Sequence, residues 1–375
     1  MKKQALDLHH KLMGKISINS KISLKSKDSL SLAYTPGVAE AVREISEDKM
    51  KVYDLTIKNN TLAVVSDGSA VLGLGNVGAE AALPVMEGKC AIFKEFADIN
   101  AFPICLNTQN SEDIIKTIKY IAPVFGGINL EDISAPRCFE IEESLIKELS
   151  IPVMHDDQHA TAIVVLAGLF NATKIVNKSL SNCRVVINGV GAAGSAICSL
   201  LSYYGVKNII LVDSLGIINN KRKNIDIYKN KLLKLINNTV TSGNLSKAAE
   251  KADIIIGVSQ KDLFTEEIVT RMNKNPIVFA LANPAPEVTE KDAIKWGTAV
   301  YANGRSDCTN QINNALVFPG FFKGLLKYRI RNISMEMKVN AALAISSLVS
   351  MPTQKFFMPS ILNKKLVKTI LASFK

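Results

Sequence analysis

The sequence predicts an α/β protein with two domains, of which the second is a doubly wound parallel sheet followed by C-terminal helices. The first observation is size: 375 residues with 47% apolar content supply material for two hydrophobic cores. The second is that short apolar runs alternate with helical patterns along the first 300 residues or so. The third is a strand, glycine-rich turn, helix and strand in succession, beginning at about residue 184.

The first predicted domain covers residues 1–159. Its helical patterns include residues 111–121, with the sequence SEDIIKTIKYI. The apolar runs between such patterns are at residues 62–65, 90–93, 103–106, 123–128 and 151–155. This alternation is typical of an α/β catalytic domain.

The second predicted domain covers residues 160–375 and begins with an apolar helix at residues 160–176. Strands are expected at residues 184–188, 208–213, 252–258 and 276–283, each next to helical material, as in a doubly wound sheet. After about Gly320 the pattern is helical with basic faces, and we expect these helices to pack back on one or both domains.

Composition excludes several functional classes. The net charge of +11 comes largely from residues 323–375, where Glu336 is the only acid, and from a basic stretch near Lys221. Neither region interleaves aromatic residues with its basic ones, so we expect no nucleic-acid partner. The longest apolar stretches fall short of the roughly 20 residues that span a bilayer. The residues after Lys3 have no apolar core of the length that a secretory signal needs, so we expect no export. Six scattered cysteines without a CxxC pair indicate a reducing compartment, so a cytoplasmic location is expected.

The pattern GxGxxG occurs twice, so the motif alone does not locate a nucleotide site. In the copy at Gly73, Gly75 and Gly78, Pro84 interrupts the helical pattern that follows, which favours a structural turn. The second copy directly follows a strand, opens a helix and leads to a second strand that ends in Asp213. This unit has the length and the terminal acid of a Rossmann dinucleotide site, whose turn consists of Gly189, Val190, Gly191, Ala192, Ala193 and Gly194.

Glycine permits a tight turn and a close approach of the backbone, so that amides at the helix N-terminus hold a pyrophosphate. Asp213 is then expected to face the adenosine ribose and to repel a 2′-phosphate, which favours NAD over NADP. Three basic residues that follow within a short loop could neutralise such a phosphate, so both cofactors stay open: Lys221, Arg222 and Lys223.

Two acidic pairs each follow an apolar run. Glu131 and Asp132 come after residues 123–130, and Asp156 and Asp157 come after residues 151–155. The carboxyl ends of strands are where α/β folds place their sites. Three carboxylates from two loops would suit a hard divalent cation such as Mg²⁺ or Mn²⁺.

Eight segments, in order and at compatible spacing, resemble the short bacterial branch of the malic enzymes. They lie between about Leu30 and Gly324 and read SLAYTPGVAE, VVSDGSAVLGLGNVG, PVMEGKCAIFKEFADINAFPICL, INLEDISAPRCFEIE, MHDDQHATA, NGVGAAG, ANPAPE and NQINNALVFPG. Eight linked segments are far more specific than either glycine motif.

The resemblance implies roles for individual residues. Glu131, Asp132 and Asp157 would bind the metal ion. Lys89, in MEGK, would be the general base, and Asp156 would pair with it and orient it.

The resemblance also implies that Tyr34, in AYTPG, is the general acid. Asn314 and Asn283 would hold the substrate, and Asn283 would also line the cofactor site. The implied partners are malate and a second copy of the chain in a homodimer.

The implied reaction is oxidation of malate with NAD or NADP, followed by decarboxylation to pyruvate. A base must take the hydroxyl proton, which a lysine does only when it is neutral, so its pKa must be lowered by burial or by positive charge. A divalent cation would supply that charge and would act as a Lewis acid during loss of CO₂. Tyr34 would then protonate the carbon of the enolate.

One position departs from the larger members of the family, which carry an arginine in the segment corresponding to SDGSAVLG. Ala70 occupies that segment here, so the residues that hold the malate carboxylate are left open. The alternative function is a related metal-dependent reaction on the same scaffold, either that of a malolactic-type enzyme, which keeps its cofactor bound and releases lactate, or that of an oxaloacetate-decarboxylating relative. A non-catalytic dinucleotide-binding regulator is a further alternative, but it would not require Lys89, Tyr34 and a three-carboxylate metal site together.

Overall fold

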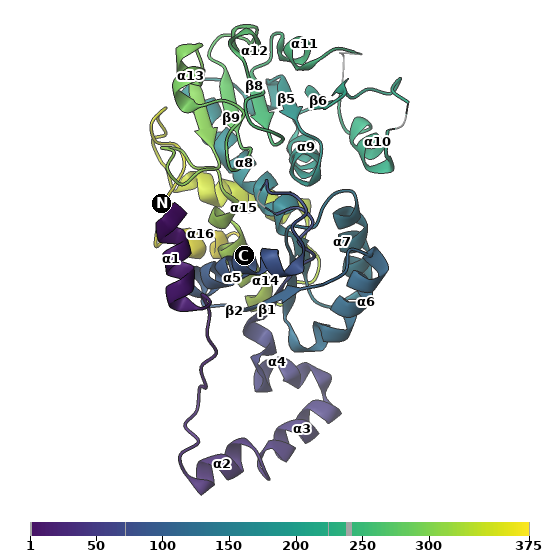
Figure 1. The fold of residues 1–375 in the computed structure, drawn as a ribbon, viewed down its shortest axis with the longest axis vertical. Helices are drawn as coiled ribbons and strands as arrows, with labels where there is room; N and C mark the ends of the chain where they lie inside the picture. The colour runs from purple at the N-terminus through teal and green to yellow at the C-terminus, as the bar shows by residue number, and fades with distance from the viewer. Residues whose placement is uncertain (1, 72, 224, 238–241, 375) are drawn as a thin grey trace.

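The computed structural model describes residues 2–71, 73–223, 225–237 and 242–374. These residues form two sheets, each with helices around it (Figure 1). The first has four strands in the order β2-β1-β3-β4, and the second has six in the order β10-β9-β8-β5-β6-β7. Every pairing is parallel except that of β6 with β7. The predicted α/β fold with a Rossmann-type sheet is confirmed.

The first sheet is covered on both faces. Alternate residues of β1 point to opposite sides, so Leu62 and Val64 join one core cluster while Ala63 and Val65 join another. Helices α5 and α14 pack on the first side, and α6 and α7 contribute to the second cluster. The elements of this region are β1 Thr61–Ser66, α5 Ala79–Ala97, β2 Asn100–Cys105, α6 Ser111–Ile121, η3 Ala122–Val124, β3 Gly127–Leu130, α7 Arg137–Glu148 and β4 Val153–His155.

Two local expectations for this region need correction. Residues 90–93, one of the apolar runs, lie within helix α5 because Cys90 and Phe93 face the core on its buried side. Pro84 does not interrupt this helix, which runs through it from Ala79 to Ala97. A proline at the sixth position removes only one hydrogen bond near the helix start, and burial of the following turns outweighs that loss.

The second sheet has the predicted strands, all of them buried on both faces. Helix α9 follows the glycine-rich turn and packs against α8. The elements are β5 Val185–Asn188, α9 Ala192–Tyr204, β6 Ile209–Asp213, β7 Gly216–Ile217, α10 Ile227–Leu233, α11 Leu245–Ala249, β8 Ile254–Gly257, α12 Glu266–Thr270, β9 Ile277–Ala280, α13 Glu290–Lys295 and β10 Val300–Asn303.

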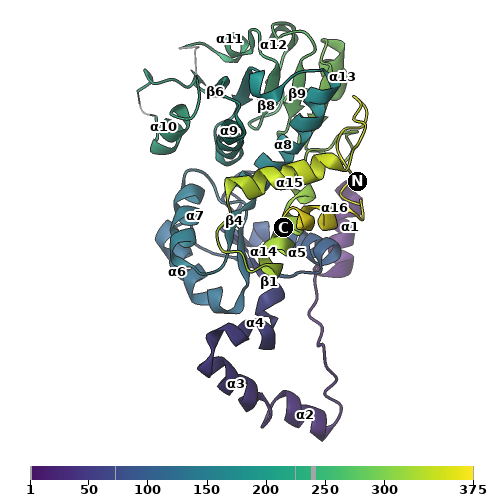
Figure 2. The same ribbon diagram turned by 180° about the vertical axis from the view of Figure 1, so that it is seen from behind.

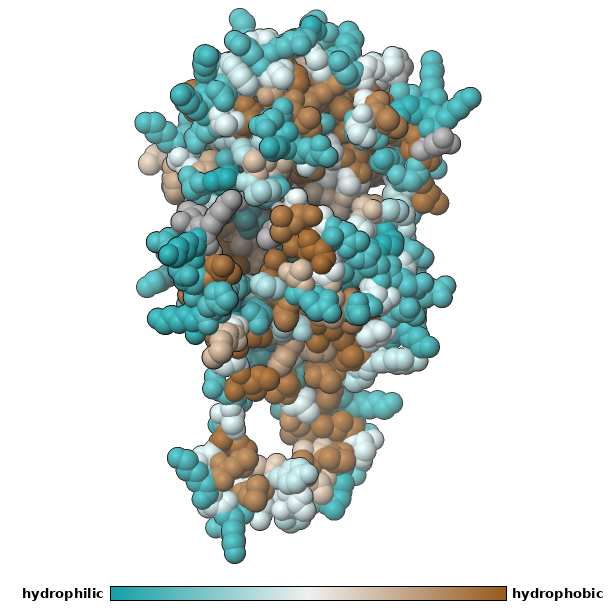
Figure 3. Space-filling view, viewed as in Figure 1, coloured by the Kyte–Doolittle hydropathy of each residue, from teal (hydrophilic) through white to brown (hydrophobic). Residues whose placement is uncertain are grey.

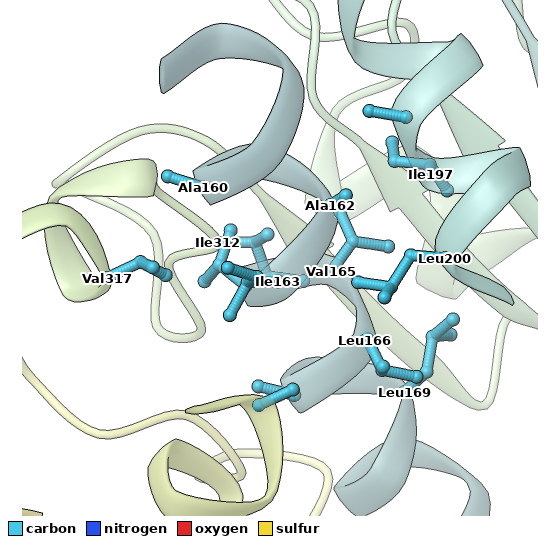
Figure 4. Packing of buried hydrophobic residues seen from close by; sticks show 14 of the residues in the cluster. Ala160, Ala162, Ile163, Val165, Leu166, Leu169, Ile197, Leu200, Ile312 and Val317 are labelled. Carbon is cyan, nitrogen blue, oxygen red and sulfur yellow. The ribbon is translucent and has the colours of Figure 1, made fainter. Parts of the chain in front are cut away.

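Helix α8, Asp156–Ile175, is the element that joins the two sheets. Between Ala160 and Phe170 it is apolar on all sides, and Figure 4 shows its side chains between α9 and the segment that carries Ile312 and Val317. The predicted domain boundary at 159/160 falls inside this continuous helix and stays a prediction. Around α8 are η4 Leu180–Asn182, η5 Asn314–Leu316, α14 Phe318–Lys327, α15 Met335–Ser347 and α16 Leu366–Ala372.

The C-terminal helices return to the first domain. Helix α14 packs on α5, and α15 packs along α8. Because Phe318 and Phe322 both contact Phe93 of α5, a single core cluster extends from the first sheet to the second.

The N-terminal helices form an arm that projects from the body. In both views the arm lies at the far end of the molecule from the second sheet (Figures 1 and 2), and helices α2 and α3 contain no buried residue. The arm's surface shows many apolar side chains (Figure 3). Its elements are α2 Lys27–Ala33, α3 Val38–Glu47, η1 Lys49–Lys51 and α4 Val52–Leu55. Helix α1 Lys2–Leu12 lies beside the body instead (Figures 1 and 2), and η2 Ile57–Asn60 leads from the arm into β1.

Candidate active site

Three carboxylates meet where strands β3 and β4 end. Glu131 and Asp132 follow β3, and Asp157 lies in the first turn of α8 directly after β4. One oxygen from each of the three side chains lies within 4.8 Å of the others. The backbone N–H of Asp132 donates to Asp157 Oδ2 at 3.0 Å, which ties the two loops together. The structure therefore brings together the three residues expected to bind the metal.

The electrostatics of this cluster suit a divalent cation. Burial raises the pKa of Glu131 well above its usual range, and although Lys89 lowers it, three nearby aspartates raise it further. Carboxylates that repel one another in a buried site are stabilised by a hard cation, and oxygen donors are the ligands that Mg²⁺ and Mn²⁺ prefer. These side chains fit the predicted ion.

Lys89 reaches this cluster from α5. Its Nζ lies 2.5 Å from Asp156 Oδ2 and 2.7 Å from Glu131 Oε1, and it sits over the Phe318 ring at 4.2 Å from the ring centre. Burial lowers the pKa of this amine, but the surrounding carboxylates outweigh burial and raise it. With these carboxylates alone around it, the lysine is an ammonium, the opposite of the neutral base that the reaction needs.

Asp156 connects Lys89 to the second domain. It is fully buried, and its Oδ2 accepts hydrogen bonds from Lys89 Nζ and, at 2.7 Å, from Asn314 Nδ2. Burial raises the pKa of this aspartate, and the charge of Lys89 acts in the opposite direction. The expected pairing of Asp156 with Lys89 is present, and Asn314, 158 residues away in sequence, joins the same group.

Asn283 follows strand β9, in a loop held by a buried acid. Glu287 accepts hydrogen bonds from the backbone N–H groups of Ala282 and Ser259, at 3.0 and 3.1 Å. A side chain at Gly73 would come within 2.0 Å of the Asn283 carbonyl oxygen, so the backbone of the first domain touches this loop. Asn283 thus lies where the two domains meet.

The first glycine-rich segment is a turn, as expected. Gly73, Gly75 and Gly78 all have positive φ, and Val71 bridges Gly75. A side chain at Gly68 would come within 2.1 Å of the Gly78 carbonyl oxygen, so the segment folds tightly on itself. Its backbone packs closely against the Asn283 loop of the second domain.

The turn before α9 has the features that a pyrophosphate site requires. Gly189 has a φ of 104°, and a side chain there would meet the Val258 carbonyl at 2.6 Å. A side chain at Gly194 would come within 1.8 Å of the Gly189 carbonyl, whereas nothing lies within 4 Å of the corresponding position at Gly191. Glycine is needed at two positions for packing, and the backbone at the third is open to a ligand, beside the N-terminus of a 13-residue helix.

Asp213 ends β6 as predicted, but its charge is paired. Arg222 contacts both of its oxygens, at 2.9 and 3.1 Å, and Lys229 contacts Oδ2 at 3.2 Å. Burial raises the pKa of Asp213, and its basic neighbours outweigh that effect and lower it. Of the three basic residues named from the sequence, Arg222 contacts Asp213. Lys229, which also contacts Asp213, was not predicted from the sequence.

Tyr34 is not part of this cluster within one chain. It caps helix α2 on the projecting arm, and 68% of its surface is exposed. The views in Figures 1 and 2 agree that α2 lies apart from α5, which carries Lys89. The expected general acid and general base are therefore separated in a single copy.

The structure places Arg137, a residue that sequence reasoning missed, next to the loop that carries Ala70. Arg137 Nη1 lies 2.9 Å from Asp67 Oδ2, and Asp67 in turn accepts from Ser69, beside Ala70. The backbone N–H of Ala70 donates to the Asp132 carbonyl, so this loop is tied to the metal-site loop. The sequence could have pointed to Arg137, because this arginine follows the predicted metal ligand Asp132 by five residues, in the segment EDISAPR.

Comparison with known proteins identifies the family. Residues 13–122 match the model described as malic enzyme, N-terminal domain, and residues 159–371 match the one described as malic enzyme, NAD binding domain. Among curated proteins, the bifunctional malic/malolactic enzyme of Bacillus subtilis is 52% identical over 93% of this chain and 86% of its own length. The NAD-dependent malic enzyme of Geobacillus stearothermophilus is 53% identical over 95% of this chain and 75% of its own length.

Solved structures agree. The NAD-dependent malic enzyme of Thermotoga maritima superposes with a TM-score of 0.95 at 44% identity, covering 99% of this chain and 98% of that one. The malic enzyme of Pyrococcus horikoshii gives a TM-score of 0.93 at 44% identity, covering 100% and 89%. Two matching domain models, relatives above 50% identity and two superpositions over nearly the whole chain establish that this chain belongs to the malic enzyme family.

Proposed function

We propose that this protein oxidises malate with NAD or NADP and decarboxylates the product to pyruvate, using Mg²⁺ or Mn²⁺. The observation that carries the proposal is the buried group in which Lys89 contacts Glu131 and Asp156 beside Asp132 and Asp157. A base, a partner that orients it and a three-carboxylate cation site within one buried group match the demands of this chemistry.

Lys89 is the proposed general base. Its contact with Asp156 fixes the position of Nζ, and the Phe318 ring keeps water from one side of the amine. When bound, a divalent cation held by Glu131, Asp132 and Asp157 supplies the positive charge that lowers the pKa of Lys89 and acts as a Lewis acid toward the substrate carbonyl. Lys89 then takes the hydroxyl proton while hydride passes to the nicotinamide.

Asn314 and Asn283 are the proposed substrate contacts. Asn314 donates to Asp156 Oδ2, which also accepts from Lys89 Nζ. The shared acceptor fixes the amide of Asn314 close to the proposed base. Asn283 approaches from the second domain, in the loop whose Glu287 also holds Ser259, and Ser259 packs against Gly189 of the dinucleotide turn. We propose that the two amides hold malate between the cation site and the nicotinamide.

Protonation of the enolate needs a second group, and Tyr34 is the proposed donor. Within one chain this tyrosine is exposed on the arm and separated from Lys89. We propose that the arm of one copy delivers Tyr34 to the site of a second copy, so that the active unit is a homodimer. Each site then contains Lys89 from one copy and Tyr34 from the other.

The surface of the arm supports this assembly. Leu32 is 78% exposed and Val42 is 61% exposed, and no residue of α2 or α3 is buried. Monomeric proteins rarely expose large contiguous apolar surfaces, so a projecting arm with such a surface requires a partner. A second copy is the partner that also completes the proposed chemistry.

A cytoplasmic location is part of the proposal. All six cysteines are free, as in a reducing compartment. Among the described residues, no helix is both long and apolar enough to cross a bilayer.

The test is an assay that follows reduced cofactor and pyruvate with malate, Mn²⁺ and either NAD or NADP. The proposal expects equal amounts of pyruvate and reduced cofactor. A second candidate follows from the bifunctional name of the Bacillus subtilis relative. Lactate release without net formation of reduced cofactor would favour this malolactic reaction, and no turnover of malate with either cofactor would contradict both.

A further inference from the structure

A cavity of about 400 Å³ lies at the border of the two domains, among helices α7, α8, α9, α10 and α15. Figure 1 shows α7 below α9 and α10, and Figure 2, the view from behind, shows α15 in front. Most of the lining is apolar and includes Phe139, Leu200, Leu232 and Met335. This volume lies in the range of small-molecule sites. Charged and polar side chains line it beside the apolar surface, among them Glu142, Glu143, Gln158, His159, Lys231 and Lys338.

Lys338, from α15, lines this cavity and is almost completely buried, with 8% of its surface exposed. Its Nζ lies 2.9 Å from His159 Nδ1, and among the described residues no carboxylate lies within ion-pair distance of it. Burial lowers the pKa of this amine, and the charge of Glu142, which acts in the opposite direction, does not outweigh burial. A buried ammonium whose partner is a neutral ring nitrogen is costly unless an anion reaches it.

The nearest acid in the lining, Glu142, is already used by other donors. Its Oε1 accepts the backbone N–H of His155 at 2.6 Å. Its Oε2 accepts Gln158 Nε2 at 3.1 Å and His159 Nε2 at 3.0 Å. The carboxylate therefore holds the first turn of α8, and it does not contact Lys338.

We propose that this cavity is a regulatory site for an amphipathic monocarboxylate, whose carboxylate pairs with Lys338 while its apolar tail packs against Leu200, Leu232 and Met335. Lys338 is the buried cation of the lining, whereas Lys231 lies at the exposed rim and is paired with Glu143. The buried cation selects an anionic group, and the apolar lining selects an aliphatic or aromatic tail. The site uses none of the residues proposed for the reaction itself.

The contacts of Lys338 connect such a ligand to the cation site. When Lys338 donates to His159 Nδ1, the ring must donate from Nε2 to Glu142. Glu142 in turn holds the N–H of His155, the residue that precedes Asp156 and Asp157. A carboxylate that draws Lys338 away from His159 weakens this chain of hydrogen bonds, so we expect it to weaken metal binding.

The test is isothermal titration of the full-length protein with sodium hexanoate, with 1-hexanol as the uncharged probe of the same tail. Lys338→Met removes the charge and keeps the length of the side chain, and loss of a buried charge does not threaten folding. Lys231→Met is the matched control, because Lys231 lines the same cavity at its exposed rim and pairs with Glu143.

The proposal expects hexanoate to bind the wild type and Lys231→Met similarly, with at least a tenfold loss of affinity in Lys338→Met. Hexanol should bind the wild type far more weakly than hexanoate. Equal binding of both probes, no binding of hexanoate, or hexanoate binding that survives in Lys338→Met would overturn the site.

The connection to the metal is measured by titrating Mn²⁺ with and without saturating hexanoate, without malate or turnover. We expect hexanoate to raise the Kd for Mn²⁺ about fivefold or more, and Mn²⁺ to weaken hexanoate by the same factor. An unchanged Kd for Mn²⁺ at saturating hexanoate would contradict the regulatory role. Because neither titration involves catalysis, failure here is distinct from failure of the proposed reaction.

Discussion

Lys89 Nζ lies 2.5 Å from Asp156 Oδ2, and both side chains are buried. The two residues come from different elements, helix α5 and the first turn of α8, and are 67 positions apart. This pair fixes the proposed base beside the metal-site carboxylates. The predictions below follow from that arrangement and from its neighbours.

The two proton-transfer residues should fail differently when they are changed. Lys89→Ala removes the base that acts as hydride leaves, so malate oxidation should fall by about 10²–10⁴-fold. Tyr34→Phe keeps the ring and removes the donor, so protonation of the enolate should become the slow step. Supplying oxaloacetate with Mn²⁺ and reduced cofactor measures the partition between reduction to malate and decarboxylation to pyruvate.

In this assay Tyr34→Phe should retain reduction better than pyruvate formation, whereas Lys89→Ala should lose reduction, since the same lysine returns the hydroxyl proton. Binding of Mn²⁺ and dinucleotide is the control for folding. Loss of both activities in equal proportion in both variants would contradict the division of roles.

Metal dependence should be complete. Excess chelator should abolish turnover, and Asp157→Ala should remove metal-dependent activity because one of three ligands is lost. The dinucleotide turn lies in the second domain, so the variant should still bind NAD or NADP, as measured by titration. Full activity in excess chelator is the result that this prediction does not allow.

Much of the site could be predicted because parallel strands end at the same edge of a sheet. Glu131 and Asp157 follow β3 and β4, which pair directly, so two acidic pairs after two apolar runs had to meet. The dinucleotide turn was predictable from local sequence, since its glycines stand directly between a strand and a helix.

Other features depend on tertiary contacts that no local pattern encodes. Lys338 contacts His159 across 179 residues, and Asn314 contacts Asp156 across 158. The position of Tyr34 follows from the direction in which the arm leaves the body. Pro84 stays helical because of burial further along α5, which outweighs a local rule.

Cofactor choice should depend on the pairing of Asp213 with Arg222. We keep NAD as the expected cofactor, because an acid at the end of the second strand of a Rossmann unit typically binds the ribose, although the charge of Asp213 is paired with Arg222 here. Arg222→Gln should leave the negative charge of Asp213 unpaired and remove a positive charge beside it. Both changes disfavour a 2′-phosphate, so kcat/KM with NADP should fall more than kcat/KM with NAD. Titration with 2′,5′-ADP against 5′-AMP measures the same preference without turnover. A variant that binds the two nucleotides in the wild-type ratio would contradict this role, as would a wild type with the larger kcat/KM for NADP.

Stability at acid pH should depend on Glu142. Burial raises the pKa of this carboxyl, but His159, whose ring carries a charge at acid pH, and the backbone N–H of His155 outweigh burial and lower the pKa to about 2. A lowered pKa means that the ionised form stabilises the fold above about pH 4.5, and that this contribution is lost as the pH falls toward 2. Glu142→Gln should therefore lower Tm at pH 7 by more than at pH 3, as measured by calorimetry. An equal loss of Tm at both values would contradict the role of the charge.

The most direct test of the shared site is complementation between two inactive variants. Lys89→Ala and Tyr34→Phe, coexpressed with different tags and purified through both, form a mixed dimer. If Tyr34 acts in the partner's site, one of the two sites in this dimer combines an intact Lys89 with an intact Tyr34, while the other lacks both. We predict that the mixed dimer forms pyruvate from malate at about half the wild-type rate, although each variant alone is nearly inactive. A mixed dimer as inactive as its parents would contradict the account, because each site would then carry one of the two lesions.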